Sequence, residues 1–171
     1  MKQIGKGTFS TCYQASKNTV FLKSVDPVKE CMANGWFPNA RMFPKVEHHK
    51  SLEGYTMPLY NRPSSLKKAL KPKEYEKYKM LKKLFDESWQ YQEYGQSKLE
   101  HWRERFSTIK NRTLKNHLIN ALEACANYCD SVCFEISPRN VAVSKTGNLI
   151  LLDCFFLKSK LDKVNHKRFW N

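Results

Sequence analysis

The sequence predicts an α+β fold in which a small antiparallel sheet comes first and helices follow. Short strand-like stretches occupy residues 4–23 and 43–60, separated by turn residues. From residue 64 to about residue 129 the apolar residues recur at helical spacing, and no proline lies between Pro72 and Pro138. Two apolar stretches, 141–143 and 149–153, then flank a turn and predict a hairpin. At 171 residues the chain favours one domain, or two small parts that share a core.

The balance of charge points to anionic ligands. Lys and Arg number 30 against 16 Asp and Glu, a formal net charge of +14. Such a field attracts nucleotides, nucleic acids or acidic proteins. No apolar run approaches the roughly 20 residues that cross a bilayer, and Met1-Lys2-Gln3-Ile4 does not resemble a signal peptide. We therefore expect a cytoplasmic protein that has no membrane partner.

Much of this charge lies between Lys67 and Lys83, where eight lysines stand against two glutamates. One interpretation is a solvated helix face, and the other is a docking surface for an acidic partner. We do not expect specific nucleic-acid binding, because no recognised DNA-binding motif accompanies the charge.

The six cysteines predict neither disulfides nor a metal site. Without a secretory signal, disulfides are not expected. Cys125, Cys129 and Cys133 are spaced by four, which would place them on one helix face. The paired spacing of a zinc motif is missing, so we interpret them as a buried stripe of small residues.

The N-terminal stretch predicts a glycine-rich hairpin followed by an apolar strand. Gly5 and Gly7 flank one residue, and a Phe-Ser tip follows. Glycines let the backbone turn sharply and approach a ligand, and N–H groups at such a turn can bind phosphate oxygens. After a turn at residues 16–18, the strand Val20-Phe21-Leu22-Lys23 ends in a lysine.

Turn and capping residues divide the rest of the chain into further elements. Asp26 and Pro27 predict the start of a short helix, and Gly35 predicts its end. The next elements are expected to be strands at 43–48 and 54–60, and helices at 73–89, 97–109 and from Thr113 to about Asp130.

The stretch after these helices places three oxygen donors at one end of the predicted hairpin. Glu135 precedes a tight loop, Asn140 follows five positions later, and Asp153 ends the second apolar stretch. Carboxylate and amide oxygens that converge in this way suit a magnesium ion and a phosphate chain.

In this order, the motifs resemble the protein kinases, and most of all the minimal serine/threonine kinases of short-tailed bacteriophages. The Gly-x-Gly hairpin, Lys23, Glu135, Asn140 and Asp153 carry the resemblance, which covers roughly residues 1–157. It implies a protein-kinase-like bilobal fold. Residues 1–60 would form a sheet lobe with a short helix and a hinge, and residues 61–171 a reduced helical lobe with the catalytic-loop and metal-binding hairpin.

The resemblance also assigns roles in binding ATP and Mg²⁺. Glu135 would orient the acceptor hydroxyl, while Asn140 and Asp153 would hold magnesium. Lys23 would hold the phosphates and pair with Glu30, for which Glu47 and Glu53 are alternatives. The remaining nucleotide contacts would come from the glycine-rich loop, the residue over the adenine and the hinge: Gly5, Lys6, Gly7, Thr8, Phe9, Ser10, Cys12, Leu59 and Tyr60.

Three departures from the kinase pattern keep two functions open. Glu135 stands where kinases have Asp, Asp153-Cys154-Phe155 lacks the glycine of Asp-Phe-Gly, and only 18 residues, ending at Asn171, follow Asp153. The peptide-binding surface would then be truncated, or be supplied by a partner or by a second copy in a dimer. One function is a minimal kinase that phosphorylates itself or host proteins in the host cytoplasm. The alternative is a weak or inactive kinase-like protein whose basic surface binds an acidic partner.

Overall fold

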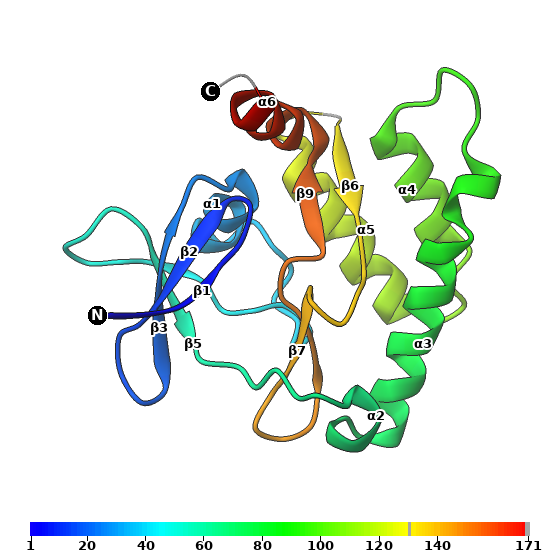
Figure 1. Ribbon diagram of the computed structural model, residues 1–171. Coiled ribbons are helices and arrows are strands. Elements are labelled where there is room, and N and C mark those ends of the chain that lie inside the picture. Colours follow the sequence, from blue (N-terminus) through cyan, green and yellow to red (C-terminus); the bar gives the residue numbers. More distant parts are fainter. Residues whose placement is uncertain (130, 170–171) are drawn as a thin grey trace.

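The computed structural model describes residues 1–129 and 131–169, with side chains as far as residue 166. Five antiparallel strands form one sheet on the N-terminal side of the molecule (Figure 1). Their spatial order is β1 (Lys2–Lys6), β2 (Ser10–Gln14), β3 (Thr19–Ser24), β5 (Tyr55–Pro58) and β4 (Glu47–His48). Together with the helices, this sheet confirms the predicted α+β class.

Two short strand pairs lie between the sheet and the helices (Figure 1). One pair is β6 (Val132–Phe134) with β9 (Phe155–Leu157), and the other is β7 (Val141–Val143) with β8 (Leu149–Leu151). Gly147 closes the β7–β8 hairpin with a φ of 75°, a conformation that glycine adopts at little cost. The predicted hairpin is therefore present.

The helices lie mainly on the far side of these pairs from the sheet, except for α1, which sits beside the sheet (Figure 1). The described helical segments are α1 (Pro27–Ala33), α2 (Leu66–Ala69), α3 (Pro72–Asp86), the 3-10 turn η1 (Ser88–Tyr91), α4 (Lys98–Ser107), α5 (Arg112–Ala126) and α6 (Lys158–Phe169). No helix among the described residues has the length and apolar character needed to cross a membrane.

Local capping explains where several helices begin. Asp26 accepts a hydrogen bond from the N–H of Val28, and Pro27 opens the first turn of α1. Ser97 and Glu100 form a reciprocal capping box at α4. Gly35, at a φ of 73°, follows the end of α1. The predicted start and stop of α1 are thus confirmed.

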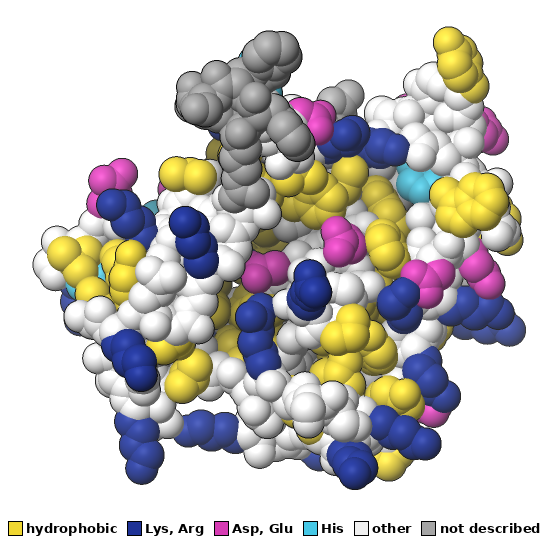
Figure 2. Space-filling model, viewed as in Figure 1, with side chains coloured by type: hydrophobic (Ala, Val, Ile, Leu, Met, Phe, Trp, Pro, Cys, Tyr) yellow, Lys and Arg dark blue, Asp and Glu magenta, His cyan; other side chains and the backbone are white. Residues whose placement is uncertain are grey.

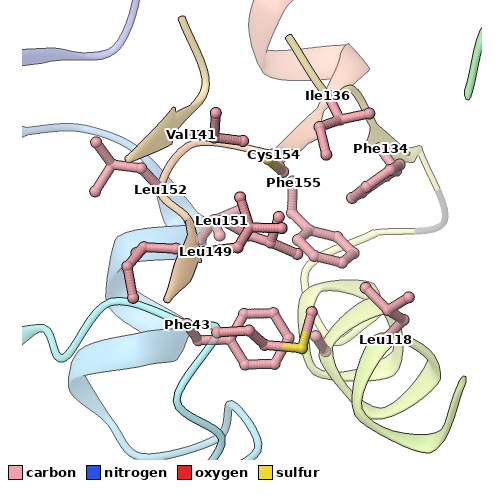
Figure 3. Close-up of a cluster of buried hydrophobic side chains, with 14 of the residues drawn as sticks. Phe43, Leu118, Phe134, Ile136, Val141, Leu149, Leu151, Leu152, Cys154 and Phe155 are labelled. Carbon is pink, nitrogen blue, oxygen red and sulfur yellow. The ribbon is translucent and has the colours of Figure 1, made fainter. Parts of the chain in front are cut away.

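A single hydrophobic core joins the sheet to the helical region. Val20 and Leu22 of β3 belong to the same buried cluster as Leu118 of α5 and Phe134 of β6. Figure 3 shows the centre of this cluster, where Phe43, Leu118, Phe134 and Phe155 surround the aliphatic side chains of the β7–β8 hairpin. The hairpin that carries the candidate site therefore rests on a packed apolar base.

The strand predicted at 43–48 is present only in part. Glu47–His48 pairs with β5, whereas residues 36–46 form no strand. Pro44 has no N–H to donate to a sheet. Phe43 is buried against Phe37 and Phe155, and the carbonyl of Met42 accepts a hydrogen bond from the N–H of Leu151 at 2.7 Å. The segment thus crosses from the sheet to the hairpin.

The cysteine stripe predicted on one helix is wrong. Helix α5 ends at Ala126, so only Cys125 lies on it, while Cys133 lies in β6. Asp130, to which this helix was expected to extend, lies outside the described residues. Cys125 and Cys133 are nevertheless buried, as the small-residue interpretation requires.

The connection after β5 runs alongside the hairpin. The N–H of Asn61 donates to the carbonyl of Val143 at 3.1 Å, and the N–H of Val143 donates back to Asn61 at 2.8 Å. Further on, Glu74 of α3 accepts a hydrogen bond from the N–H of Leu149. The predicted boundary at residue 60 therefore falls in a segment that is fixed to the helical side.

Candidate functional site

Main-chain hydrogen bonds bring the three predicted oxygen donors to one place. The N–H of Glu135 donates to the carbonyl of Cys154 at 2.8 Å. The carbonyl of Asn140 accepts hydrogen bonds from the N–H groups of Leu152 and Asp153, both at 3.0 Å. The main chains of residues 135, 140 and 153 therefore lie close together where the two strand pairs meet.

Lys29 of α1 binds the carboxylate at the centre of this site. Its ammonium lies 2.7 Å from Oδ1 of Asp153 and donates a second hydrogen bond to the carbonyl of Leu152 at 2.9 Å. The side chain of Lys29 is 2% exposed, whereas that of Asp153 is 49% exposed. Asp153 therefore reaches from a buried cation toward solvent, with one carboxylate face still accessible.

The surrounding charges keep both partners of this pair ionised. Burial lowers the pKa of Lys29, but the carboxylates of Asp153 and Asp26 outweigh burial and hold the pKa above its usual value. Burial raises the pKa of Asp153, but Lys29 and Arg62 outweigh it, so the pKa lies below its usual value. The pair is therefore charged over the physiological pH range.

Basic and polar groups from the sheet side also face Asp153. Arg62, in the connection after β5, donates a hydrogen bond to the carbonyl of Arg139 at 2.8 Å and acts electrostatically on Asp153. Burial raises the pKa of the Cys12 thiol, which feels both Arg62 and Asp153. Cys12 of strand β2 therefore lies near the charged groups of the site, and its predicted place over an adenine stays a prediction.

Figure 2 shows this face of the molecule. Acidic side chains lie near its middle with Lys and Arg side chains beside them, next to a hollow between the sheet and the helices that has hydrophobic walls. A mixed, largely cationic rim of this kind suits a phosphate-bearing ligand that carries a divalent cation.

The predicted pair of Lys23 and Glu30 is not formed. Lys23 is exposed and, by strand alternation, lies on the face of β3 opposite to the buried Leu22. Glu30 instead accepts a hydrogen bond from the hydroxyl of Tyr55 at 2.6 Å, and its pKa is lowered mainly by this bond. The lysine that reaches the site is therefore Lys29, one position before Glu30.

The two alternative glutamates do not fill the role either. Glu47 and Glu53 are both exposed, and the structure places neither in an ion pair within the described residues. Glu53 lines a separate surface pocket of about 290 Å³, together with Glu30 and His48.

The glycine-rich stretch forms the turn between β1 and β2, as predicted. The N–H of Gly7 donates to the carbonyl of Ser10 at 2.8 Å, and the hydroxyl of Ser10 lies 2.6 Å from that of Ser24. A side chain at Gly5 would meet only ordinary van der Waals contact, 3.8 Å from Cys12. The fold itself therefore does not require glycine there, and a requirement would have to come from a ligand.

The other residues of this loop are either exposed to solvent or hydrogen-bonded to the end of β3. Lys6 and Thr8 are exposed, whereas Phe9 is half-buried. The carbonyl of Phe9 accepts a hydrogen bond from the N–H of Val25 at 3.1 Å, which fastens the loop to the end of β3.

The predicted hinge residues already have partners. The N–H of Leu59 donates to the carbonyl of Asn18 at 2.8 Å, and the hydroxyl of Tyr60 accepts a hydrogen bond from the N–H of Lys45 at 3.2 Å. An adenine could use the N–H of Leu59 only if its bond to Asn18 opened.

The donor set fits a magnesium ion that arrives with phosphates better than a metal held by protein alone. Within residues 1–129 and 131–169, no group of three or more His, Cys, Asp or Glu could hold a metal. The site offers the carboxylate of Asp153 and the amide side chain of half-buried Asn140, with half-buried Glu135 nearby. Magnesium commonly takes one or two carboxylates, and substrate phosphates complete its coordination.

The lysine-rich segment lies on α2 and α3, where local ion pairs take up half of its lysines. Each of these pairs joins residues three or four positions apart on α3. They are Lys77–Glu74, Lys79–Glu76, Lys82–Asp86 and Lys83–Glu87. This pattern is typical of a solvated helix face, although a docking role for the segment stays a prediction.

Sequence reasoning missed Lys29 and Arg62. Lys29 stands on a helix whose apolar neighbours Val28 and Met32 are buried, so its place in the helical repeat indicated an inward direction. No comparable signal marks Arg62, which follows a strand in an irregular connection.

Comparison of the chain with protein-family models, with curated proteins and with solved structures found no match in any of the three. The geometry of the site is therefore the main basis for a functional proposal.

Proposed function

We propose that this protein is an ATP- and Mg²⁺-dependent phosphotransferase of protein-kinase-like bilobal architecture, acting on serine or threonine hydroxyls. The observation that carries the proposal is the convergence of Glu135, Asn140 and Asp153, with the buried ammonium of Lys29 on Asp153. Phosphoryl transfer depends mainly on positioning and charge neutralisation, which such a group of residues can supply.

Each residue has a role that follows from its place. Asp153 and Asn140 would hold the magnesium ion, which when bound neutralises the phosphate charge. Lys29 fixes one oxygen of Asp153 and leaves the exposed side of the carboxylate for the metal. Arg62 lies near enough to Asp153 for its charge to act on the carboxylate, and there it would attract phosphate oxygens.

Glu135 would orient the acceptor hydroxyl and take its proton. Its backbone is fixed by the hydrogen bond to Cys154, so its longer side chain moves the carboxylate by about an ångström relative to Asp. A displacement of that size can cost on the order of a hundredfold in rate. We therefore propose a slow enzyme. Host proteins, or the chain itself, are the acceptors that the phage resemblance suggests.

The second candidate is a kinase-like binding protein, and two contacts favour it. Lys29 occupies one oxygen of the metal-binding carboxylate, and the N–H of Leu59 is already bonded to Asn18. In this case the basic surface on α2 and α3 would bind an acidic partner, and nucleotide would bind weakly or not at all.

The test is transfer of label from ATP by the purified full chain with Mg²⁺. Label is supplied in separate reactions on the γ- and the α-phosphate, which distinguishes phosphoryl transfer from AMP transfer. The variants are Asp153→Asn and Lys29→Met. The matched controls are Asp86→Asn, on exposed α3, and Lys23→Met, on the outer face of β3.

We expect γ-label on protein with the wild type and with both controls, and a loss of at least about a hundredfold in Asp153→Asn and Lys29→Met. Equal activity in Lys29→Met and wild type would refute the role of Lys29. No transfer by the wild type, with nucleotide-induced thermal stabilisation retained, would favour the binding protein.

A further inference from the structure

A second pocket is lined in part by Glu135. Its volume is about 270 Å³, and it opens between η1, α4 and the outer face of the β6–β9 pair. Phe134 and Phe155 point into the core, so Cys133, Glu135 and Phe156 lie on the opposite face of the pair. We call this space the acceptor pocket.

Aromatic side chains form most of its walls. Trp102 is buried and packs edge to face on Phe134, while Phe156 is half-buried. Trp89 lies at the opening and is 73% exposed. A large apolar side chain left in water beside a pocket is typical of a surface that binds a partner, and tryptophan is the residue most enriched at such contacts.

The pocket also contains a polar group without a partner. His101 is 3% exposed, lines the pocket, and its Nδ1 has no hydrogen-bond partner in the structure. Burial, and then Lys98 and Arg105, lower the pKa of this imidazole, so the ring is neutral at pH 7. An unpaired buried nitrogen is costly, and a bound N–H or O–H group would relieve that cost.

The charges around the pocket favour a ligand that is acidic where it lies outside the pocket and neutral where it enters it. Lys98 lines the pocket and acts on His101 and Cys133, while Arg105 also acts on His101 and Lys158 on Cys133. Two carboxylates oppose these three cations, Glu104 near His101 and Asp162 near Cys133, so basic groups are in slight excess. Glu135, in contrast, faces the interior of the pocket and would repel a phosphate there. A nucleic acid is thus disfavoured, although exposed aromatic and basic residues would otherwise suit one.

The size of the pocket limits the ligand further. Sites for small molecules usually measure about 300–1,000 Å³, so 270 Å³ suits one large side chain rather than a nucleotide. A peptide that placed such a side chain between Trp89 and Phe156 would bring its neighbouring residue to Glu135.

We propose that the acceptor pocket binds a large apolar side chain of an acidic peptide and presents the adjacent serine or threonine hydroxyl to Glu135. This inference rests on the proposed function. In the reaction, the hydroxyl oxygen forms a bond to the γ-phosphorus of ATP and the bond from that phosphorus to the β,γ-bridging oxygen breaks. The hydroxyl proton passes to Glu135, and ADP leaves.

The first experiment measures peptide binding without nucleotide, so that it does not depend on catalysis. An acetylated peptide with Trp before Ser and two Glu residues is titrated into the full chain and followed by NMR of the tryptophan indole N–H groups. Comparison peptides carry Ala for the Trp, or Lys for both Glu residues. The protein variants are Trp89→Ala and, as a matched control, Trp36→Ala. Trp36 is also exposed but packs against Tyr128, away from the pocket.

We expect the indole signal of Trp89 to shift, and binding to weaken at least about tenfold in Trp89→Ala and with either altered peptide, but not in Trp36→Ala. Absence of binding, or equal binding by both variants, would overturn the proposal. Binding of a single-stranded oligonucleotide that displaces the peptide would also overturn it, in favour of a nucleic-acid site.

The second experiment adds γ-labelled ATP and compares transfer to the peptide with transfer to water. In Trp89→Ala we expect the KM for the peptide to rise about tenfold, whereas in the control Trp36→Ala the KM for the peptide and the rate of ATP hydrolysis should both match wild type. Hydrolysis with no selective peptide binding would refute the acceptor pocket and leave the proposed function standing. Selective peptide binding with no transfer at all would refute the proposed function and leave a peptide-binding pocket.

Discussion

The lysine of α1 and the lysines of α3 meet carboxylates in opposite ways. Lys29 is 2% exposed, and its partner Asp153 is 124 residues away in sequence. Four lysines of α3 pair with carboxylates three or four residues away, and all four are far more exposed than Lys29, from 28% for Lys77 to 74% for Lys83. Exposed pairs of this kind contribute little because water and salt screen them. The segment with the most lysines is therefore not the one whose charge contributes most to stability.

The largest effect is expected when the buried pair loses its carboxylate. Asp153→Ala would leave the Lys29 ammonium buried with the Leu152 carbonyl as its remaining hydrogen-bond acceptor. We expect the free energy of unfolding to fall by about 3 kcal/mol, because a buried charge that loses its hydrogen-bonded partner is costly even with Asp26 nearby. Urea unfolding followed by circular dichroism measures this, with Asp86→Ala as the exposed control.

The double variant Asp153→Ala/Lys29→Met sharpens the same comparison. Removing the unpaired ammonium as well should recover a large part of the loss, since a neutral side chain of similar length pays no cost for a buried charge. If the double variant were as unstable as the sum of the two single variants, the two residues would not be coupled.

Lowering the pH should reduce the stabilisation that the Lys29–Asp153 pair contributes, by less than the loss expected for Asp153→Ala. The pKa of Asp153 is below its usual value, so its ionised form stabilises the fold above the unfolded pKa of about 3.9. That contribution is lost as the pH falls through the lower pKa of the folded state. Unfolding measured between pH 2 and pH 6 should show a steeper acid decline in wild type than in Lys29→Met. Identical slopes would contradict the assignment.

Asp26 should respond to pH in the opposite direction. Burial raises its pKa despite Lys29 and the N–H of Val28, so the folded protein favours the neutral form. Its contribution to stability is largest below pH 3.9 and falls as the pH rises through the higher pKa of the folded state. We expect Asp26→Asn, which keeps the cap, to be more stable than wild type at pH 7 and equal to it at pH 3.

The matched control Asp26→Ala removes the cap of α1 altogether. Its stability should fall by about 1 kcal/mol at pH 3, where the charge of Asp26 no longer contributes. A stabilising effect of Asp26→Ala at that pH would show that the hydrogen bond to Val28 is unimportant.

The smallest effect is expected on α3. Lys82→Met breaks an exposed pair with Asp86 and should change the free energy of unfolding by less than about 0.5 kcal/mol, with no change in phosphoryl transfer. A loss comparable to that of Asp153→Ala would mean that the lysine-rich segment is structural rather than a solvated face.

Local chemistry made much of the fold predictable. The cap at Asp26, the turn at Gly147 and the helical spacing of α3 to α5 depend on residues close in sequence, and the structure contains each of them. The strand expected at 43–48 failed because Phe43 packs into the core at a distance, which sequence spacing does not reveal.

The candidate site divides in the same way. The spacing of Glu135 and Asn140 in one loop, followed by Asp153 after the hairpin, was visible as a pattern, and main-chain bonds bring these residues together. The choice of lysine was not visible. Lys23, at a strand end, was the lysine expected at the site, and Lys29 was missed, yet it is Lys29 that binds Asp153.

The sequence alone therefore determined the α+β class, the helices α1 and α3 to α5, the β7–β8 hairpin and the spacing of the three oxygen donors around it, because each depends on short-range periodicity, turns and caps. The tertiary structure decided that Lys29 rather than Lys23 binds Asp153, and that Glu135 borders an aromatic pocket. Both depend on how α1 and α4 pack against strands that lie far away in the chain, and that packing comes from burial of the shared core rather than from any local pattern.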